Sequence, residues 1–177
     1  MNSAEPADDS GASPRSCPSC DARMPLRFCE SCGHDSALPT GEPSRWIAIV
    51  DADPEFYRRA AARSGNGRVE FPRSFEPRRI TLQDSVTLVG RRNRRQQIAP
   101  RIDLGIPPVD RGVSTRHAEL RIRDSGLTVA DLGSTNGTSL NGSDELLQVN
   151  HEVRLSVGDR IHVGAWTTIT IGELDWG

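Results

Sequence analysis

Apolar and polar residues alternate through much of the second half of the chain. In the clearest example, residues 117–123, alanine, leucine and isoleucine occupy one face and charged residues the other. A period of two is typical of a strand with one buried face. Three further segments show the same pattern: 127–131, 160–163 and 167–174. The sequence therefore predicts that this region is built from β-strands.

Turn-forming dipeptides separate the predicted strands at short spacing: Asn136-Gly137, Asn141-Gly142 and Gly158-Asp159. Asparagine followed by glycine favours tight hairpin turns, and such turns join antiparallel strands, whereas parallel strands need long connections. No convincing helical period of apolar residues occurs after residue 67. We therefore expect a mainly β fold, a sandwich of antiparallel strands.

A strand and a short helix are predicted ahead of this region. Residues 46–50 form a compact apolar run, which indicates a strand. Asp53 and the proline and glutamate after it supply an N-cap and a first turn for a helix that would end near Arg63. Residues 45–85 would thus form an extension packed onto the sandwich. Four aromatic side chains would anchor it: Trp46, Phe56, Phe71 and Phe75.

Composition changes before residue 45, and this change sets the expected domain boundaries. Residues 1–16 are small, polar and acidic, so they carry too little apolar surface to fold. Residues 35–44 have the proline, serine and glycine content of a linker. We therefore expect a disordered tail at 1–16, a small module at 17–34, and a domain at 45–177 whose core spans about 86–171.

Four cysteines fall within the small module: Cys17, Cys20, Cys29 and Cys32. They form two C-x-x-C pairs, and each pair can wrap a tight turn around one metal ion. Two such turns complete a tetrahedral site of four thiolates, for which Zn²⁺ is the expected ion and iron an alternative. Because the protein would fill all four positions, no position is left for water, and the zinc would be structural.

The residues around the cysteines agree with bound metal. They resemble the short bacterial zinc ribbons of the Cys-Pro-x-Cys and Phe-Cys-x-x-Cys-Gly type, with matches at Pro18, Phe28 and Gly33 besides the cysteines. The sequence has no apolar run of signal-peptide or membrane-span length, so we expect the protein in the cytoplasm, where thiols stay reduced. Two disulfides or a redox pair are the alternative use of these cysteines.

The formal charge of −2 excludes a strongly basic protein that coats nucleic acid. All 22 basic residues are arginines, whose forked guanidinium suits bound phosphate. Within the small module, Arg23 and Arg27 are balanced by Asp21 and Glu30. This module therefore lacks the charge pattern that would follow a nucleic-acid backbone.

Three polar blocks lie beside predicted strands, where loops carry chemistry on a rigid frame. They are Gly90-Arg91, Ser114-Thr115-Arg116-His117 and Ser134-Thr135-Asn136-Gly137-Thr138. A guanidinium fork, hydroxyls and neighbouring donors suit a bound phosphate, without an acid, a base or a metal. The catalytic alternative is Ser114 as nucleophile and His117 as base, oriented by Asp110 or Asp131. These side chains need not face one another and there is no G-x-S-x-G elbow, so no enzyme is predicted.

The order of these blocks, followed by Asn141-Gly142 and Gly158-Asp159, resembles the forkhead-associated (FHA) domain family. The resemblance covers the segment from about Val86 to Ile171, half of the chain. It implies an antiparallel β-sandwich of about eleven strands that binds phosphothreonine peptides through loops at one end. It also implies a preference for phosphothreonine over phosphoserine, because a small pocket takes the threonine methyl group.

The resemblance implies a role for each matching residue. Five would contact the phosphopeptide: Arg91, Ser114, Thr115, Thr135 and Asn136. Three would support the site: Gly90, His117 and Gly137. Arg91 would clamp the phosphate, Ser114 would donate its hydroxyl to it, and Asn136 would hydrogen-bond the peptide backbone. His117 would be buried and brace the binding loop.

Thr115 departs from the family pattern, in which arginine, lysine or asparagine often follows the motif serine. The hydroxyl of Thr115 can still donate a hydrogen bond, but it brings no charge. The arginine-rich loop 91–95 could supply the missing positive potential.

Together these features predict a non-enzymatic adaptor that docks onto proteins phosphorylated by a Ser/Thr kinase, with a structural zinc ribbon as a second interaction module. Neither a membrane nor nucleic acid is an expected partner. The alternative is a zinc-ribbon nucleic-acid or transcription-complex factor with a degenerate or autoinhibited FHA domain. In an autoinhibited form, a phosphorylated Thr40 from the linker would occupy the site.

Overall fold

The computed structural model describes residues 15–16, 22–24, 30–31, 46–64, 69–123 and 125–174. The chain divides into two compact units, Met1–Glu42 and Pro43–Gly177. In the first unit, β1 (Arg15–Ser16) pairs antiparallel with β2 (Arg23–Met24). The four cysteines of the predicted zinc ribbon and Thr40 lie outside the described residues. No helix in the described part of the chain has the length and apolar character needed to cross a membrane.

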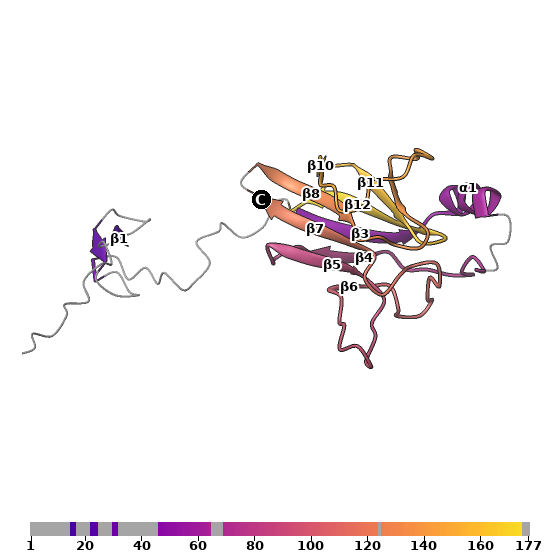
Figure 1. Cartoon of the computed structure of the whole chain (residues 1–177), viewed down its shortest axis with the longest axis horizontal. Coiled ribbons are helices and arrows are strands. Elements are labelled where there is room, and N and C mark those ends of the chain that lie inside the picture. The colour runs from indigo at the N-terminus through magenta and orange to yellow at the C-terminus, as the bar shows by residue number, and fades with distance from the viewer. Residues whose placement is uncertain are drawn as a thin grey trace, which may run out of the picture. The chain divides into compact units, whose positions relative to one another are not determined.

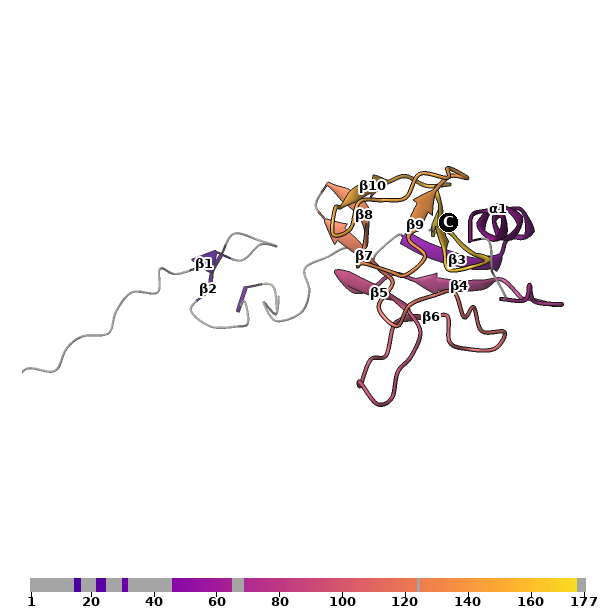
Figure 2. The ribbon, with the colours of Figure 1, turned by 45° about the vertical axis from the view of Figure 1, so that its right-hand side comes forward.

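The second unit contains two five-stranded sheets that face each other as a sandwich (Figure 1 and Figure 2). One sheet has the strand order β10-β8-β7-β5-β6. Its strands are β5 (Val86–Gly90), β6 (Ile102–Asp103), β7 (Ala118–Arg123), β8 (Gly126–Asp131) and β10 (Val153–Leu155). The other sheet has the order β4-β3-β12-β11-β9. Its strands are β3 (Trp46–Ala52), β4 (Arg78–Thr81), β9 (Thr138–Leu140), β11 (Arg160–Val163) and β12 (Thr167–Glu173).

The mainly β sandwich predicted from the sequence is confirmed, with two differences in detail. The four alternating segments form β7, β8, β11 and β12. The two sheets contain ten described strands, where the FHA resemblance implies about eleven. One strand pair, β5 with β6, is parallel rather than antiparallel. The chain leaves β5 at Gly90 and makes a long excursion through residues 91–101, so it can re-enter the sheet in the same direction.

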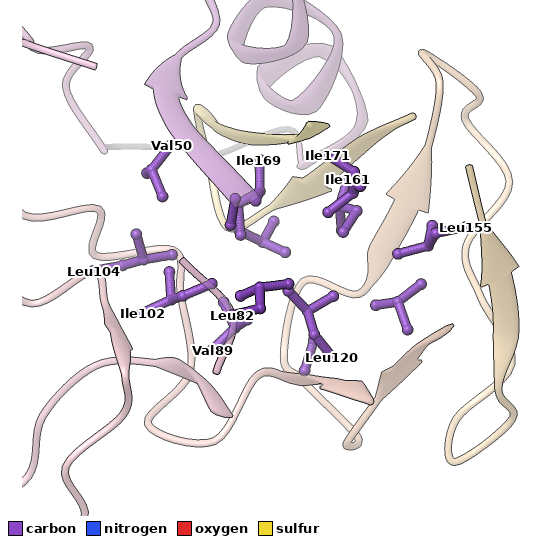
Figure 3. Close-up of a cluster of buried hydrophobic side chains, with 14 of the residues drawn as sticks. Val50, Leu82, Val89, Ile102, Leu104, Leu120, Leu155, Ile161, Ile169 and Ile171 are labelled. Carbon is purple, nitrogen blue, oxygen red and sulfur yellow. The ribbon is translucent and has the colours of Figure 1, made fainter. Parts of the chain in front are cut away.

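The core lies between the two sheets and explains the alternating pattern. Figure 3 shows side chains from both sheets meeting there, among them Val50 and Ile169 from one sheet and Val89 and Leu120 from the other. Each of these four side chains is at most 1% exposed. The polar residues between them point away from this layer, because successive side chains of a strand lie on opposite faces.

Residues 46–52 contribute more than the expected extension packed onto the sandwich. β3 lies inside its sheet, between β4 and β12, and all seven of its residues pair with β12, from Trp46 opposite Glu173 to Ala52 opposite Thr167. Ala48 and Val50 are fully buried. A strand with a fully buried inner face and a partner on each side is part of the fold, so the folded core begins well before residue 86.

The helix α1 (Pro54–Ser64) follows β3 as the sequence predicts. Asp53 caps it: one carboxylate oxygen of Asp53 accepts the backbone N–H groups of Glu55 and Phe56, both at 2.9 Å. The helix ends one residue after the predicted Arg63.

The predicted aromatic anchors pack against the sandwich. The ring of Phe56 is buried and stacks on His162 of β11, with the ring centroids 4.8 Å apart. Phe71 and Phe75 both approach Trp166 edge to face, with centroid separations of 6.4 and 5.6 Å. Trp46 is partly buried against the core. The segment that precedes β5 is therefore fixed to the sandwich by its aromatic side chains as well as by its strands.

Candidate functional site

The structure brings the three polar blocks together through direct hydrogen bonds between loops. The backbone N–H of Arg91 donates to the carbonyl oxygen of Ser114 at 3.1 Å. The backbone N–H of Thr135 donates to Ser114 Oγ at 3.1 Å. The side-chain amide of Asn136 donates to the carbonyl oxygen of Gly112 at 2.7 Å. Blocks that are far apart in the sequence thus form one surface at one end of the sandwich.

Gly90 allows the first block to approach the second. A Cβ atom on this residue would overlap the carbonyl oxygen of Thr115 and lie 2.8 Å from its carbonyl carbon. Gly137 has a positive φ of 74°, and a Cβ there would lie 2.7 Å from a methyl group of Leu146. A side chain at Gly90 would displace the backbone of the Ser114 loop, and one at Gly137 would displace the side chain of Leu146.

Arg91 is oriented by the loop opposite it. Its Nε donates a short hydrogen bond to the carbonyl oxygen of Val113, and its side chain is partly exposed. The two terminal nitrogens of the guanidinium have no partner among the described residues. A guanidinium fixed through Nε presents these two nitrogens as a fork, the arrangement that binds phosphate in a bidentate way.

Ser114 and Thr135 place two hydroxyls beside each other. Ser114 Oγ lies 3.3 Å from Thr135 Oγ1 and is within donating distance of it. Thr135 and Asn136 are exposed, and Ser114 and Thr115 are partly exposed. No hydrogen bond of the Thr115 side chain occurs within the described part of the chain. These side chains form an open surface rich in hydroxyl and amide groups.

His117 is hydrogen-bonded to the backbone of two of the loops. It is fully buried, and its Nδ1 accepts the backbone N–H of Ser114 at 3.1 Å. Nε2 therefore carries the proton and donates to the carbonyl oxygen of Gly137 at 3.1 Å. Burial lowers the pKa of this histidine, although the hydrogen bond to Gly137 opposes the shift.

The position of His117 does not suit the catalytic alternative. Both ring nitrogens are bound to backbone groups, and the bond to Ser114 goes to its N–H and not to its Oγ. A base that activates a serine must hydrogen-bond the serine hydroxyl. His117 instead has the buried, bracing position that the FHA resemblance implies.

The neutral state of His117 predicts how stability depends on pH. Because the pKa of His117 is lowered in the folded domain, the unfolded chain takes up the proton at a higher pH than the folded domain does. The contribution of His117 to the free energy of unfolding should therefore be constant above about pH 7 and decline as the pH falls below about 6.5. Urea unfolding across this range measures the decline, and nitrogen NMR spectra of the ring report its protonation. Protonation of His117 at pH 6 without a loss of stability would contradict this prediction.

Three buried aspartates, which the sequence analysis did not assign to the site, hold its loops. Each is followed two residues later by glycine: Asp103-Leu104-Gly105, Asp110-Arg111-Gly112 and Asp131-Leu132-Gly133. In each case one carboxylate oxygen accepts the glycine N–H, at 2.9, 2.9 and 2.8 Å respectively. This turn, in which aspartate bonds its own backbone two residues on, is a known local signal. The Asp-x-Gly pattern marks these residues as turn candidates, but it also occurs at 9–11 and 124–126, so the pattern alone does not single them out.

Asp131 holds the third block, residues 134–138, through hydrogen bonds to its carboxylate. It accepts hydrogen bonds from the hydroxyls of Ser134 and Thr138, both at 2.6 Å, and from the backbone N–H of Ser134 at 2.9 Å. Its burial raises the pKa, but the hydrogen bonds from Ser134 and Thr138 outweigh this effect and the pKa is lowered overall. Ser134 and Thr138 are thus structural, whereas Thr135 and Asn136 between them face outwards.

Residues 87–164 match the sequence profile of the FHA domain. The chain contains an FHA domain. The match includes all eight residues that the sequence analysis assigned to the phosphopeptide site or its support.

Relatives of known sequence and structure agree with this FHA domain. Over 86 residues the chain is 37% identical to the FHA domain-containing protein FhaB of Mycobacterium tuberculosis, a match that covers 49% of this chain and 47% of FhaB. This chain therefore spans about half the length of the curated relative that it matches.

Among solved structures, the FHA domain of a hypothetical Arabidopsis thaliana protein superposes with a TM-score of 0.51 at 24% identity, covering 76% of this chain and 90% of that one. This likeness supports the fold. Another similar structure comes from a structural and functional analysis of phosphothreonine-dependent FHA domain interactions. It has a TM-score of 0.46 and 26% identity, and the match covers 73% of this chain and 98% of that one.

A metal site is not part of the FHA domain as described. No group of three or more histidine, cysteine, aspartate or glutamate residues that could hold an ion occurs among the described residues. The predicted zinc ligands Cys17, Cys20, Cys29 and Cys32 lie outside them. Zinc binding therefore stays a prediction from the sequence.

Proposed function

We propose that this FHA domain binds phosphothreonine peptides, with the phosphate held by Arg91, Ser114 and Thr135. The observation that carries the proposal is the fork of Arg91, which is fixed through Nε on the Ser114 loop, where the hydroxyls of Ser114 and Thr135 lie side by side. Asn136, exposed at the edge of the same surface, would bond the peptide backbone. Thr115 would add an uncharged hydroxyl to this surface. Gly90, His117 and Gly137 would keep the loops in this arrangement.

The energetics suit a switch that depends on phosphorylation. A phosphate adds a charge of about −1.5 to −2 at neutral pH, together with three strong acceptor oxygens. Hydrogen bonds to charged groups contribute about 1.5 to 3 kcal/mol each. The loss of two of them would weaken a micromolar complex to roughly the millimolar range. The same peptide without its phosphate should therefore show no measurable binding in a micromolar assay.

Fluorescence anisotropy with a degenerate phosphothreonine peptide library tests the proposal. The native chain should bind with micromolar affinity, and the unphosphorylated library should not bind. Arg91→Ala should weaken binding by at least about a hundredfold, because it removes a charged fork that makes two hydrogen bonds. Arg154→Ala is the matched control, since it removes the same charge from β10, at the opposite edge of its sheet from β6.

Arg91 also bonds the carbonyl oxygen of Val113, so its loss could act through the loop instead. Urea unfolding of Arg91→Ala and a second variant, Thr135→Val, separate the two effects, since Thr135 is exposed. Equal binding of phosphorylated and unphosphorylated peptides would refute the proposed function.

We further propose that the whole protein is a non-enzymatic adaptor in the cytoplasm, acting downstream of a Ser/Thr kinase. In this proposal the tail ends before residue 15, earlier than the expected residue 16, because Arg15–Ser16 form β1. Residues 17–34 are a zinc ribbon, 35–44 a linker and 45–177 the FHA domain with its N-terminal strands. The support for the ribbon is the donor set itself, two C-x-x-C pairs with the spacing of a four-thiolate zinc site.

Metal analysis tests the zinc ribbon directly. The purified full chain should contain about one zinc ion, as four thiolates bind a single tetrahedral ion. Replacing Cys29 and Cys32 with serine should remove it and leave the phosphopeptide affinity of the FHA domain unchanged. A chain purified without metal, or with iron in its place, would contradict the zinc assignment.

A further inference from the structure

The segment that links β5 to β6 concentrates positive charge. Residues 91–101 contain five arginines and no acidic residue. In both views of the ribbon this segment projects away from the sandwich (Figure 1 and Figure 2). Arg91 opens it at the proposed phosphate site, and Arg94 and Arg95 are exposed at its tip. We call this segment the arginine hairpin.

The tip of the arginine hairpin is pre-organised by Asn93. Asn93 and Ile98 exchange two backbone hydrogen bonds, each of 2.9 Å, which close the hairpin. The side-chain oxygen of Asn93 accepts the N–H groups of Arg95 and Gln96 at 3.1 and 3.2 Å. Its amide nitrogen donates to the side-chain oxygen of Gln96 at 2.9 Å. A loop held in this way loses little conformational entropy when it binds a partner.

Among the described residues, the arginine side chains at the tip of the arginine hairpin take part in no ion pair with the rest of the domain. Arg92 is the structural one, since its Nε lies 3.1 Å from the buried carboxylate of Asp103. Within the described residues, Arg94, Arg95 and Arg101 make no ion pair. Like charges that are left without counterions repel one another, so this cluster favours the approach of an anion.

We propose that the tip of the arginine hairpin binds acidic or additionally phosphorylated side chains that flank the phosphothreonine of the partner. This inference rests on the proposed phosphothreonine site. Arg94 lies three positions after Arg91, so their Cα atoms are at most about 11 Å apart. An extended peptide covers this distance in about three to four residues. The preferred anionic side chains should therefore lie about three to five residues from the phosphothreonine, allowing for the length of an arginine side chain.

A peptide fits the arginine hairpin better than a nucleic acid does. Residues 91–101 contain no aromatic side chain on which a base could stack. The chain as a whole carries a net charge of −2, which repels a long polyanion. A short acidic segment next to the phosphothreonine needs only the few arginines of the tip.

Anisotropy measurements on three peptides test this inference with the full chain. One carries phosphothreonine between neutral flanks, one carries phosphothreonine with glutamates three to five residues away on both sides, and one is the acidic peptide without phosphate. The acidic flanks should tighten binding by about three- to tenfold at low salt, and the gain should disappear at high salt. The acidic peptide alone should bind weakly at low salt.

The double variant Arg94→Gln and Arg95→Gln should abolish the gain from acidic flanks and leave the affinity for the neutral-flank phosphopeptide within about twofold. The matched control is Arg58→Gln with Arg154→Gln, which removes the same charge from exposed positions on α1 and β10. That control variant should bind the acidic-flank peptide, with or without its phosphate, as tightly as the native chain does.

The outcomes separate this inference from the proposed function. If the neutral-flank phosphopeptide binds but acidic flanks add nothing, the arginine hairpin has no such role and the phosphothreonine site stands. If phosphate is irrelevant but the acidic peptide binds through Arg94 and Arg95, the function fails and the hairpin is still an acid-binding surface. If no peptide binds, both are overturned. A further outcome is that the chain binds a short DNA duplex or anionic vesicles as tightly as the acidic peptide, in a way that depends on Arg94 and Arg95. That result would show a general attraction to polyanions and would overturn the inference.

Discussion

Replacing Asp110 with asparagine is expected to lower the free energy of unfolding by about 3 kcal/mol, a large share of the stability of an ordinary domain. The carboxylate is fully buried and accepts five groups. They are the backbone N–H of Gly112, Ala165, Trp166 and Thr167 and the hydroxyl of Thr167, at 2.8 to 3.1 Å. The amide of asparagine would turn an NH₂ group towards at least one of these donors, which would then be buried without a partner.

Thermal unfolding measures this effect, and a fall in Tm of about 10 °C corresponds to the expected loss. Asp84→Asn is the matched control, because Asp84 is exposed and its replacement should change stability by less than about 0.5 kcal/mol. A Tm of the Asp110 variant within 2 °C or so of the native protein would mean that the β11–β12 turn does not need this carboxylate.

Gly90→Ala is expected to lower the free energy of unfolding by about 2 to 3 kcal/mol and also to weaken phosphopeptide binding. The added methyl group would overlap the backbone carbonyl of Thr115, which cannot rotate away as a flexible side chain can. Relief of this clash must move the Ser114 loop away from Arg91, whose backbone N–H is bonded to the carbonyl oxygen of Ser114. The distance between the guanidinium and the serine hydroxyl would then increase.

Urea unfolding and peptide anisotropy on the same sample test both parts of this prediction. Gly105→Ala is the control, since a methyl group there would lie 3.0 Å from a side-chain oxygen of Asp103 and farther from other atoms. That variant should lose about 1 kcal/mol or less. Native-like affinity in Gly90→Ala would mean that the Ser114 loop tolerates displacement, and that Gly90 serves only the packing of β5.

Local patterns predicted much of this fold because the local and the tertiary preferences agree. The alternation of residues 117–123 became β7, and Asp53 caps α1 as its position before a proline suggests. β3 was harder to place, because its pairing with β12 joins residues more than a hundred positions apart. A strand pattern shows that a segment is extended, but it does not show which strands lie beside it.

The same distinction applies to the candidate site. The motif residues Gly90, Ser114 and Asn136 were identified by their order, and the structure brings them to one end of the sandwich. The bonds of Asp110 to the turn that contains Trp166 could not be derived in this way, since they join two loops 55 or more residues apart. The Asp-x-Gly pattern marks the local hydrogen bond of Asp110 to Gly112. Its hydrogen bonds to residues 165–167 exist only because the fold brings the two loops together.

The central position of β3 determines how the domain can be tethered. At one end of the sheet Ala52 lies opposite Thr167, whose N–H and hydroxyl donate hydrogen bonds to Asp110, in the loop that leads to Ser114. At the other end Trp46 lies opposite Glu173, about 20 Å away along the strands. The chain thus enters β3 and leaves β12 at the end remote from the proposed peptide-binding surface. A surface, tag or larger protein attached at the start of β3 or the end of β12 would therefore lie at the opposite end of the sandwich from the loops of Arg91, Ser114 and Thr135.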